Sequence, residues 1–157
     1  MKRKKNYTLI VLAFAFIVTG CGNSDSTFTI SCTSEKDNSA GFETQNVVTY
    51  QFNKEQYVIG YSVETTQNFD NKETYKEYKK AQEESIKENS SDNVSYDLKS
   101  NDKKMELIYT MKIKNIDVNK AETKEEKNAL KAKSVLKSNE DMKATCKIKG
   151  IKKSKLN

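Results

Sequence analysis

The chain has 157 residues, enough for one domain, and its 28 basic and 22 acidic residues give a formal net charge of +6. Four of the basic residues lie at positions 2–5, which leaves 24 basic against 22 acidic residues, a balance that argues against a nucleic-acid-binding protein. The absence of histidine excludes Ser-His-Asp and Cys-His catalysis, and the five glycines form no phosphate-binding loop.

Residues 1–20 have the pattern of a secretory signal peptide. A cationic head at positions 2–5 precedes an apolar run at positions 9–18. As a helix this run would rise only about 15 Å, against roughly 30 Å of bilayer hydrocarbon, so it is too short for a permanent membrane span. The positive charges hold the amino end on the cytoplasmic side. We therefore expect the rest of the chain outside the membrane.

The leader ends in Val18, Thr19, Gly20 and Cys21, which resembles the lipobox of bacterial lipoproteins. In that family a diacylglycerol is attached to the cysteine sulfur, and a dedicated peptidase cuts just before it. The resemblance implies that Cys21 becomes a lipidated first residue, that residues 21–26 form a short tether, and that the protein is anchored at the extracellular face of the cell membrane. Several acyl chains give the stable anchoring that a single chain does not. The alternative is an ordinary cleaved signal peptide with Cys21 as an unrelated thiol.

The first part of the domain predicts three strands. Phe28, Ile30 and Cys32 alternate with polar residues, which is the spacing of a half-buried strand, and residues 33–46 read as a polar loop. Alternating runs at residues 48–52 and 57–63 flank a polar turn at residues 53–56, which predicts a β-hairpin. Asp37, Ser39 and Glu43 in the loop do not follow the spacing of a calcium loop, so a polar surface loop is the better interpretation.

Residues 70–89 change to a helical period. Asp70 as N-cap, with Glu73 three residues later, fits a capping box. One face of this helix carries Tyr75, Tyr78, Gln82 and Ile86. Because this apolar stripe is thin, we expect the helix to lie on the surface of the sheet.

The second half of the domain continues the pattern. Residues 94–98 and 105–113 alternate around a turn at residues 100–103, which predicts a second hairpin. Thr123 and Glu126 form another capping box, opening a helix to about Ser138. Its expected buried side holds Ala129, Ala132, Val135 and Leu136. A last strand contains Ala144, Cys146 and Ile148.

The element order is therefore βββαββαβ. One-sided alternation indicates antiparallel strands with one wet face, so we predict a single α+β domain at residues 27–150, with a sheet of about six strands and two surface helices. Residues 151–157 form a Lys-rich tail.

Two cysteines, Cys32 and Cys146, remain once Cys21 is lipidated. An even number of cysteines in an exported chain favours a disulfide bond. Each falls on the apolar face of a terminal strand, so a bond would join the ends of the domain if those strands are neighbours. The alternative is two buried free thiols that behave as small hydrophobic residues.

Lysines dominate the carboxy-terminal segment, where no acidic residue follows Asp141. The candidate contacts with an anionic membrane or wall polymer are Lys147, Lys149, Lys152, Lys153 and Lys155. Alternatively, these lysines protect an edge strand from pairing and keep a frayed tail soluble.

The mature chain is also rich in tyrosine. The tyrosines that follow the leader are Tyr50, Tyr57, Tyr61, Tyr75, Tyr78, Tyr96 and Tyr109. Some would line a groove for a peptide or a sugar, or all would fill a thin interface between sheet and helices with their hydroxyls reaching water.

Beyond Cys21, the element order over residues 47–136 is similar to that of the YehR-like group of small envelope lipoproteins of Gram-positive bacteria. This resemblance implies an α+β fold and carries no activity. We therefore expect a non-enzymatic binding or interaction module, a monomer without metal or cofactor. Its partner would be an anionic wall polymer, a membrane protein or a peptide. The alternatives are a small carboxylate-dependent hydrolase or transferase, which needs two acids meeting in a pocket, and a purely structural or immunity-type surface protein.

Overall fold

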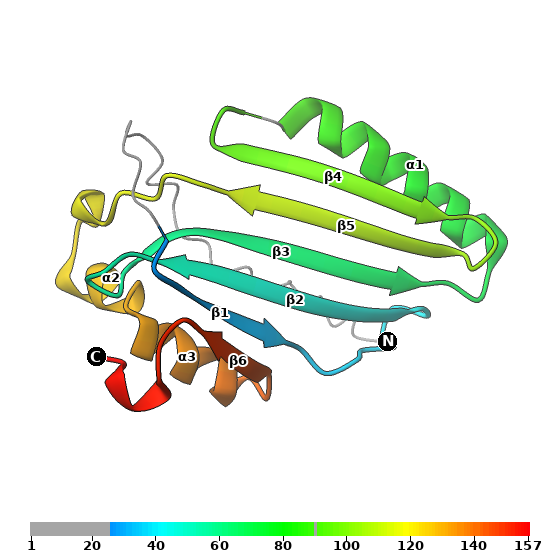
Figure 1. Ribbon diagram of the computed structural model, residues 1–157. Helices are drawn as coiled ribbons and strands as arrows, with labels where there is room; N and C mark the ends of the chain where they lie inside the picture. Colours follow the sequence, from blue (N-terminus) through cyan, green and yellow to red (C-terminus); the bar gives the residue numbers. More distant parts are fainter. Residues whose placement is uncertain (1–25, 90) are drawn as a thin grey trace, which may run out of the picture.

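One antiparallel sheet carries the other elements of the fold, as Figure 1 shows for the computed structural model. The structure describes residues 26–89 and 91–157. The signal peptide at residues 1–20, Cys21 and the tether up to residue 25 lie outside the described residues. The strands are β1 (Phe28–Thr33), β2 (Glu43–Phe52), β3 (Val58–Asn68), β4 (Val94–Asn101), β5 (Glu106–Ile113) and β6 (Thr145–Lys149). They lie side by side in the order β4-β5-β3-β2-β1-β6, so the predicted α+β class is confirmed.

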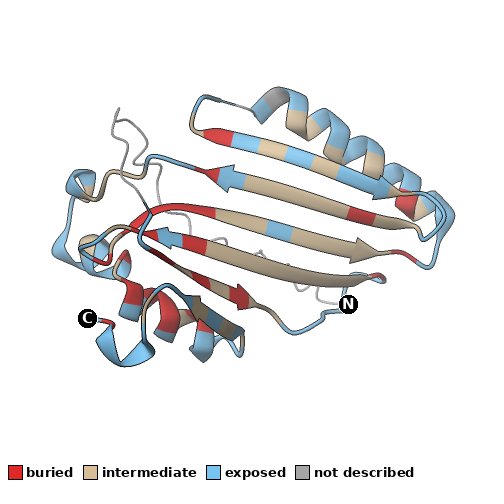
Figure 2. Ribbon diagram, in the orientation of Figure 1, coloured by how far each residue is buried: buried red, intermediate tan, exposed pale blue. Residues whose placement is uncertain are grey.

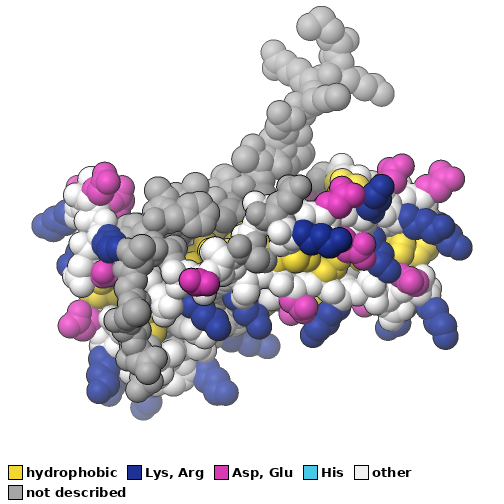
Figure 3. Space-filling view, turned by 90° about the horizontal axis from the view of Figure 1, so that it is seen from above, with side chains coloured by type: hydrophobic (Ala, Val, Ile, Leu, Met, Phe, Trp, Pro, Cys, Tyr) yellow, Lys and Arg dark blue, Asp and Glu magenta, His cyan; other side chains and the backbone are white. Residues whose placement is uncertain are grey.

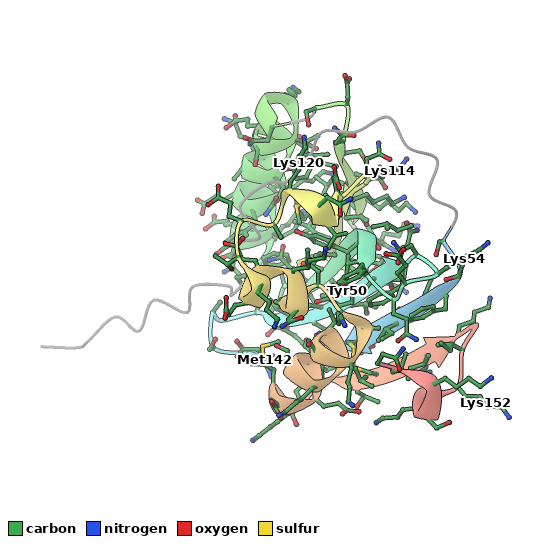
Figure 4. All side chains as sticks on the ribbon, turned by 90° about the vertical axis from the view of Figure 1, so that its left-hand side faces the viewer. Tyr50, Lys54, Lys114, Lys120, Met142 and Lys152 are labelled. Atoms are coloured by element: carbon green, nitrogen blue, oxygen red, sulfur yellow. A yellow bond between two sulfur atoms is a disulfide. The ribbon has the colours of Figure 1, made fainter. Side chains whose placement is uncertain are left out.

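The alternation of apolar residues decides which face of the sheet is covered. Strand register places Ile30 beside Tyr50 on one side and Ile148 on the other, and Tyr50 beside Tyr61. These side chains share one face, on which α1 (Lys72–Asn89) packs against β4 and β5, and α3 (Ala132–Asp141) against β6 and β1. The opposite face is mostly Ser, Thr, Gln and charged residues, exposed or half-buried. Both helices therefore lie on the same side of the sheet (Figure 4).

Two hydrophobic clusters hold the helices to the sheet. The larger lies beneath α3 and includes Ile30, Phe52 and Leu136. The smaller lies at the opposite end of the inner strands, where Tyr75 of α1 packs with Phe42, Phe69 and Leu107. Because buried area supplies most of the stability of packed helices, α1 and α3 are stabilised by separate parts of the core.

The second predicted helix is two helices, α2 (Lys124–Ala129) and α3, and this part of the predicted order was wrong. The capping box of Thr123 and Glu126 opens α2 as expected. The break follows because Lys131 has extended dihedral angles and pairs with Tyr57, while the Leu130 carbonyl accepts a hydrogen bond from the Val58 amide. Leu130 is 2% exposed and takes the buried place that was predicted for Ala129, which is exposed.

Several boundaries also differ from the prediction. β2 begins at Glu43, inside the predicted loop, because its first residues pair with the end of β3. The second hairpin turns at residues 102–105 rather than 100–103, and Met105 adopts a positive φ of 51° there.

The predicted N-cap of α1 is wrong by one residue. The Asn71 side-chain oxygen, not that of Asp70, accepts hydrogen bonds from the amides of Glu73 (2.8 Å) and Thr74 (3.1 Å). Replacing Asn71 with alanine should lower the free energy of unfolding by about 1 kcal/mol, because two helix-terminal amides lose their acceptor. Asp70→Ala is the matched control, expected within about 0.5 kcal/mol of wild type. Urea unfolding compares the two, and an equal loss in both variants would contradict the Asn71 cap.

The tail at residues 151–157 is packed, not frayed. Leu156 is 9% exposed and joins the larger cluster. The Gln56 amide holds the tail from both sides, donating to the Lys155 carbonyl (2.9 Å) and accepting from the Asn157 amide (2.7 Å). The Lys-rich segment therefore has a fixed position beside the β2–β3 turn.

Candidate interaction surfaces

Of the seven tyrosines that the sequence offers as candidate contact residues, four lie on the face of the sheet that carries the helices. This tyrosine cluster consists of Tyr50 on β2, Tyr61 on β3, Tyr96 on β4 and Tyr109 on β5. The ring centroids of Tyr50 and Tyr61 are 6.0 Å apart, and those of Tyr96 and Tyr109 are 5.9 Å apart. Alternation along the strands puts each ring on this face, and the strand order brings the four together.

The solvent exposure of the four tyrosines differs between the inner and outer strands of the cluster. Tyr50, whose position is labelled in Figure 4, is 6% exposed, and its hydroxyl oxygen accepts a hydrogen bond from the Asn139 amide of α3 (3.3 Å). Tyr96 and Tyr109 are half-buried. Burial raises the pKa of Tyr50, Tyr61 and Tyr109, and neighbouring phenols raise that of Tyr61 and Tyr109 further. A raised pKa favours the protonated hydroxyl, so Tyr50, Tyr61 and Tyr109 each offer a hydrogen-bond donor beside an aromatic ring.

Sequence reasoning missed Asn139 as a partner of this cluster. It continues the buried spacing of Ala132, Val135 and Leu136 by three residues, so the helical period alone would have placed it on the covered face.

The centre of the helix-bearing face is less covered than its ends. Val48, Val63 and Met111 lie on this face near the tyrosines by register, and all three are half-buried. Figure 2 shows the same long stretches of intermediate burial along the middle of β2, β3 and β5. The part of this face between the two helices therefore carries aliphatic and aromatic side chains that are half-buried.

Gln67 lies on the same face, opposite Leu107 of β5. Among the described residues its side-chain oxygen is buried without a hydrogen-bond partner. A buried polar atom left unpaired costs about 1–3 kcal/mol. No spacing pattern in the sequence identified this residue.

Gln67→Met should therefore raise the free energy of unfolding by about 1 kcal/mol, because it removes the unpaired acceptor and keeps the shape of the side chain. Gln51→Met, on the exposed opposite face, is the control and should change it by less than about 0.5 kcal/mol. Urea unfolding measures both. A loss of 1 kcal/mol or more in Gln67→Met would mean that the amide is hydrogen-bonded in solution.

The other predicted tyrosines have separate structural contacts. The Tyr75 hydroxyl donates to the Asp102 carboxylate, which also accepts from the Lys79 ammonium at 2.9 Å. These hydrogen bonds lower the pKa of Asp102 and tie α1 to the β4–β5 turn. Tyr57 lies beneath the ammonium groups of Lys127 and Lys131, 5.7 and 5.6 Å from its ring centroid.

Asp37 in the first loop and Glu43 at the start of β2 both have local polar partners. Asp37 accepts from the amide and hydroxyl of Ser39, both at 2.8 Å, and Glu43 pairs with Lys36 at 2.9 Å. These contacts lower the pKa of both carboxyl groups. Asp37 and Ser39 lie on an exposed loop, as predicted, whereas Glu43 belongs to β2. Within the described residues, no three His, Cys, Asp or Glu side chains come together as a metal site would require.

The predicted disulfide is present. Cys32 of β1 and Cys146 of β6 are direct register partners, with Cα atoms 4.0 Å apart, and their sulfurs are bonded. Among the described strands, β6 lies at the edge of the sheet beside β1, so the bond fixes the last strand of the domain to the first.

The predicted lysine contacts lie at this same edge. Lys147 and Lys149 are exposed on β6, on the face away from the helices. Lys152 and Lys155 are exposed on the tail, and Lys152 points away from the domain in Figure 4. Lys153 instead binds Glu140 of α3 at 2.7 Å.

Comparisons with protein-family models, curated protein sequences and solved structures find no match to this chain. The lipobox at residues 18–21 and the YehR-like element order therefore stay predictions from the sequence. Within residues 26–89 and 91–157, no helix combines the length and the hydrophobicity that crossing a bilayer requires.

Proposed function

We propose that this chain is exported, anchored by lipid on Cys21 at the extracellular face of the cell membrane, and works there as a non-enzymatic binding module. The order of charge, apolar run, small residues and cysteine in residues 2–21 supports the anchor. The observation that carries the binding role is the tyrosine cluster on a partly covered face of the sheet.

The cluster has the chemistry of a contact surface. Tyrosine offers a large rigid ring with few rotatable bonds, so it loses little entropy on binding, and its hydroxyl adds a hydrogen bond. Half-buried Tyr96 and Tyr109 would contact the partner, whereas Tyr50 and Tyr61 are buried in the larger hydrophobic cluster on the neighbouring strands. Such a surface suits a peptide segment, of a membrane protein or free, or a sugar of the wall.

Site-specific photo-crosslinking in living cells tests this function. A photoreactive phenylalanine analogue at position 109 is expected to give a reproducible crosslinked product, because this side chain is on the helix-bearing face. The neighbouring position 110 is the matched control, since register puts Thr110 on the opposite face. Tyr96→Ala should weaken the product from position 109. Equal products from positions 109 and 110, or a product insensitive to Tyr96→Ala, would contradict the proposed surface.

A further inference from the structure

The charge of the domain is strongly polarised along the chain. Residues 131–157 hold nine lysines and two acidic residues, whereas residues 26–130 hold fifteen lysines and nineteen acidic residues. The first set forms α3, β6 and the tail, which lie together at the lower edge of the domain in Figure 1. We call this the basic edge, and its exposed lysines are Lys133, Lys137, Lys143, Lys147, Lys149, Lys152, Lys153 and Lys155.

The acidic residues of the basic edge do little to offset these charges. Glu140 is already paired with Lys153, which leaves Asp141 as the other acidic residue. Among the described residues, no salt bridge involves Lys147, Lys149 or Lys152. The β4–α1 edge, seen from above in Figure 3, instead mixes Lys with Asp and Glu.

The chain enters the domain beside the basic edge. Thr29 is the register partner of Lys149, and the Thr27 carbonyl oxygen lies so close to Gly150 that a Cβ added there would be 2.9 Å from it. Only five residues, 22–26, separate Cys21 from Thr27, and a fully extended chain crosses that distance in about 20 Å. A lipid on Cys21 would therefore hold the basic edge, rather than the β4–α1 edge, next to the bilayer.

We propose that the basic edge docks on anionic phospholipid headgroups of the membrane that carries the anchor. This inference rests on the lipid anchor of the proposed function. Lysine ammonium groups near an anionic bilayer surface each favour the bound state about fivefold, and the attraction is screened by salt. The tether favours lipid over wall polymer as the partner, because it keeps the lysines within reach of the bilayer. Docking by this edge turns the net acidic part of the domain away from the anionic surface and leaves the face with the tyrosine cluster open.

Energy transfer from the lipidated full-length protein to a labelled lipid tests this orientation. A donor fluorophore at exposed Ser154, on the tail, is compared with one at exposed Ser95, on β4 at the opposite edge. In vesicles containing phosphatidylglycerol we expect strong transfer from position 154 and weak transfer from position 95. The difference should shrink in pure phosphatidylcholine and at about 1 M salt, where the Debye length falls to about 3 Å.

Charge variants separate local docking from net charge. Neutralising Lys147, Lys149 and Lys152 with glutamine should lower the ratio of docked to undocked protein roughly 100-fold. The matched control neutralises Lys72, Lys76 and Lys87 on α1, with the same loss of charge at the other edge, and should leave the ratio within about twofold of wild type.

Flotation with phosphatidylcholine vesicles reports the lipid anchor by itself, because it needs no anionic lipid. Protein that fails to float contradicts the anchor and the proposed function. Protein that floats but transfers energy equally from positions 154 and 95 overturns the docking alone. Equal effects of the two triple variants, or an orientation that requires added anionic wall polymer, also overturn it.

Discussion

Replacing both Cys32 and Cys146 with alanine is expected to lower the free energy of unfolding by about 4–5 kcal/mol. The two cysteines are 114 positions apart, so the bond closes nearly the whole domain into a ring and restricts the unfolded chain. In the folded state it fastens β6, a five-residue edge strand, to β1. Urea unfolding of the oxidised wild type and of the double variant measures the difference.

Reduction supplies the control for this prediction. A reductant should bring the wild type to the stability of the double-alanine variant and leave the variant itself unchanged. Two free sulfhydryls in the unfolded, unreduced protein, or equal urea midpoints for oxidised wild type and variant, would contradict a stabilising bond.

Replacing Phe52 with alanine is expected to cost about 3–5 kcal/mol of unfolding free energy. Phe52 is 0% exposed at the end of β2, and its ring stacks on that of Phe28 with centroids 4.8 Å apart. Truncation would leave a cavity in the larger hydrophobic cluster, where Phe28, Ile30 and Leu136 all lie. The loss combines the transfer free energy of the ring with the cost of that cavity.

Met142→Ala is the comparison for Phe52→Ala, because this large apolar side chain, which is labelled in Figure 4, is 51% exposed. It should change the free energy of unfolding by less than about 0.5 kcal/mol. Thermal and urea unfolding should rank the two variants in this order. A loss below 1 kcal/mol for Phe52→Ala would mean that the cluster beneath α3 is not closely packed in solution.

Much of the sheet could be predicted from the sequence, because apolar and polar residues alternate along antiparallel strands that have one face covered and one face in solvent. The runs around Ile30, Tyr50, Tyr61 and Met111 predicted both the strands and the face that each side chain takes. The break between α2 and α3 could not be predicted from the local sequence. It depends on hydrogen bonds from a hairpin more than seventy residues earlier, at Gln56 and Val58, and tertiary contacts override local helix propensity.

The sequence predicts which residue types could form the candidate surfaces, but it does not predict which of those residues lie together in the fold. The sequence shows seven tyrosines after residue 26, but the strand order, with β3 beside β5, is needed to show which four lie together. The sequence also shows the tail lysines, but their fixed place next to Thr27 depends on Gly150 and on the buried Leu156. Such long-range neighbours leave no periodic signal in a single sequence.

Native mass spectrometry of the protein extracted from its own membrane is the most direct test of the proposed lipid-anchored binding module. We expect a chain that begins at Cys21, carries a diacylglyceryl group there, and lacks the two hydrogens lost to the Cys32–Cys146 bond. We also expect a reproducible additional mass from a bound partner. A mature species unmodified at Cys21 would contradict the proposed anchor and function.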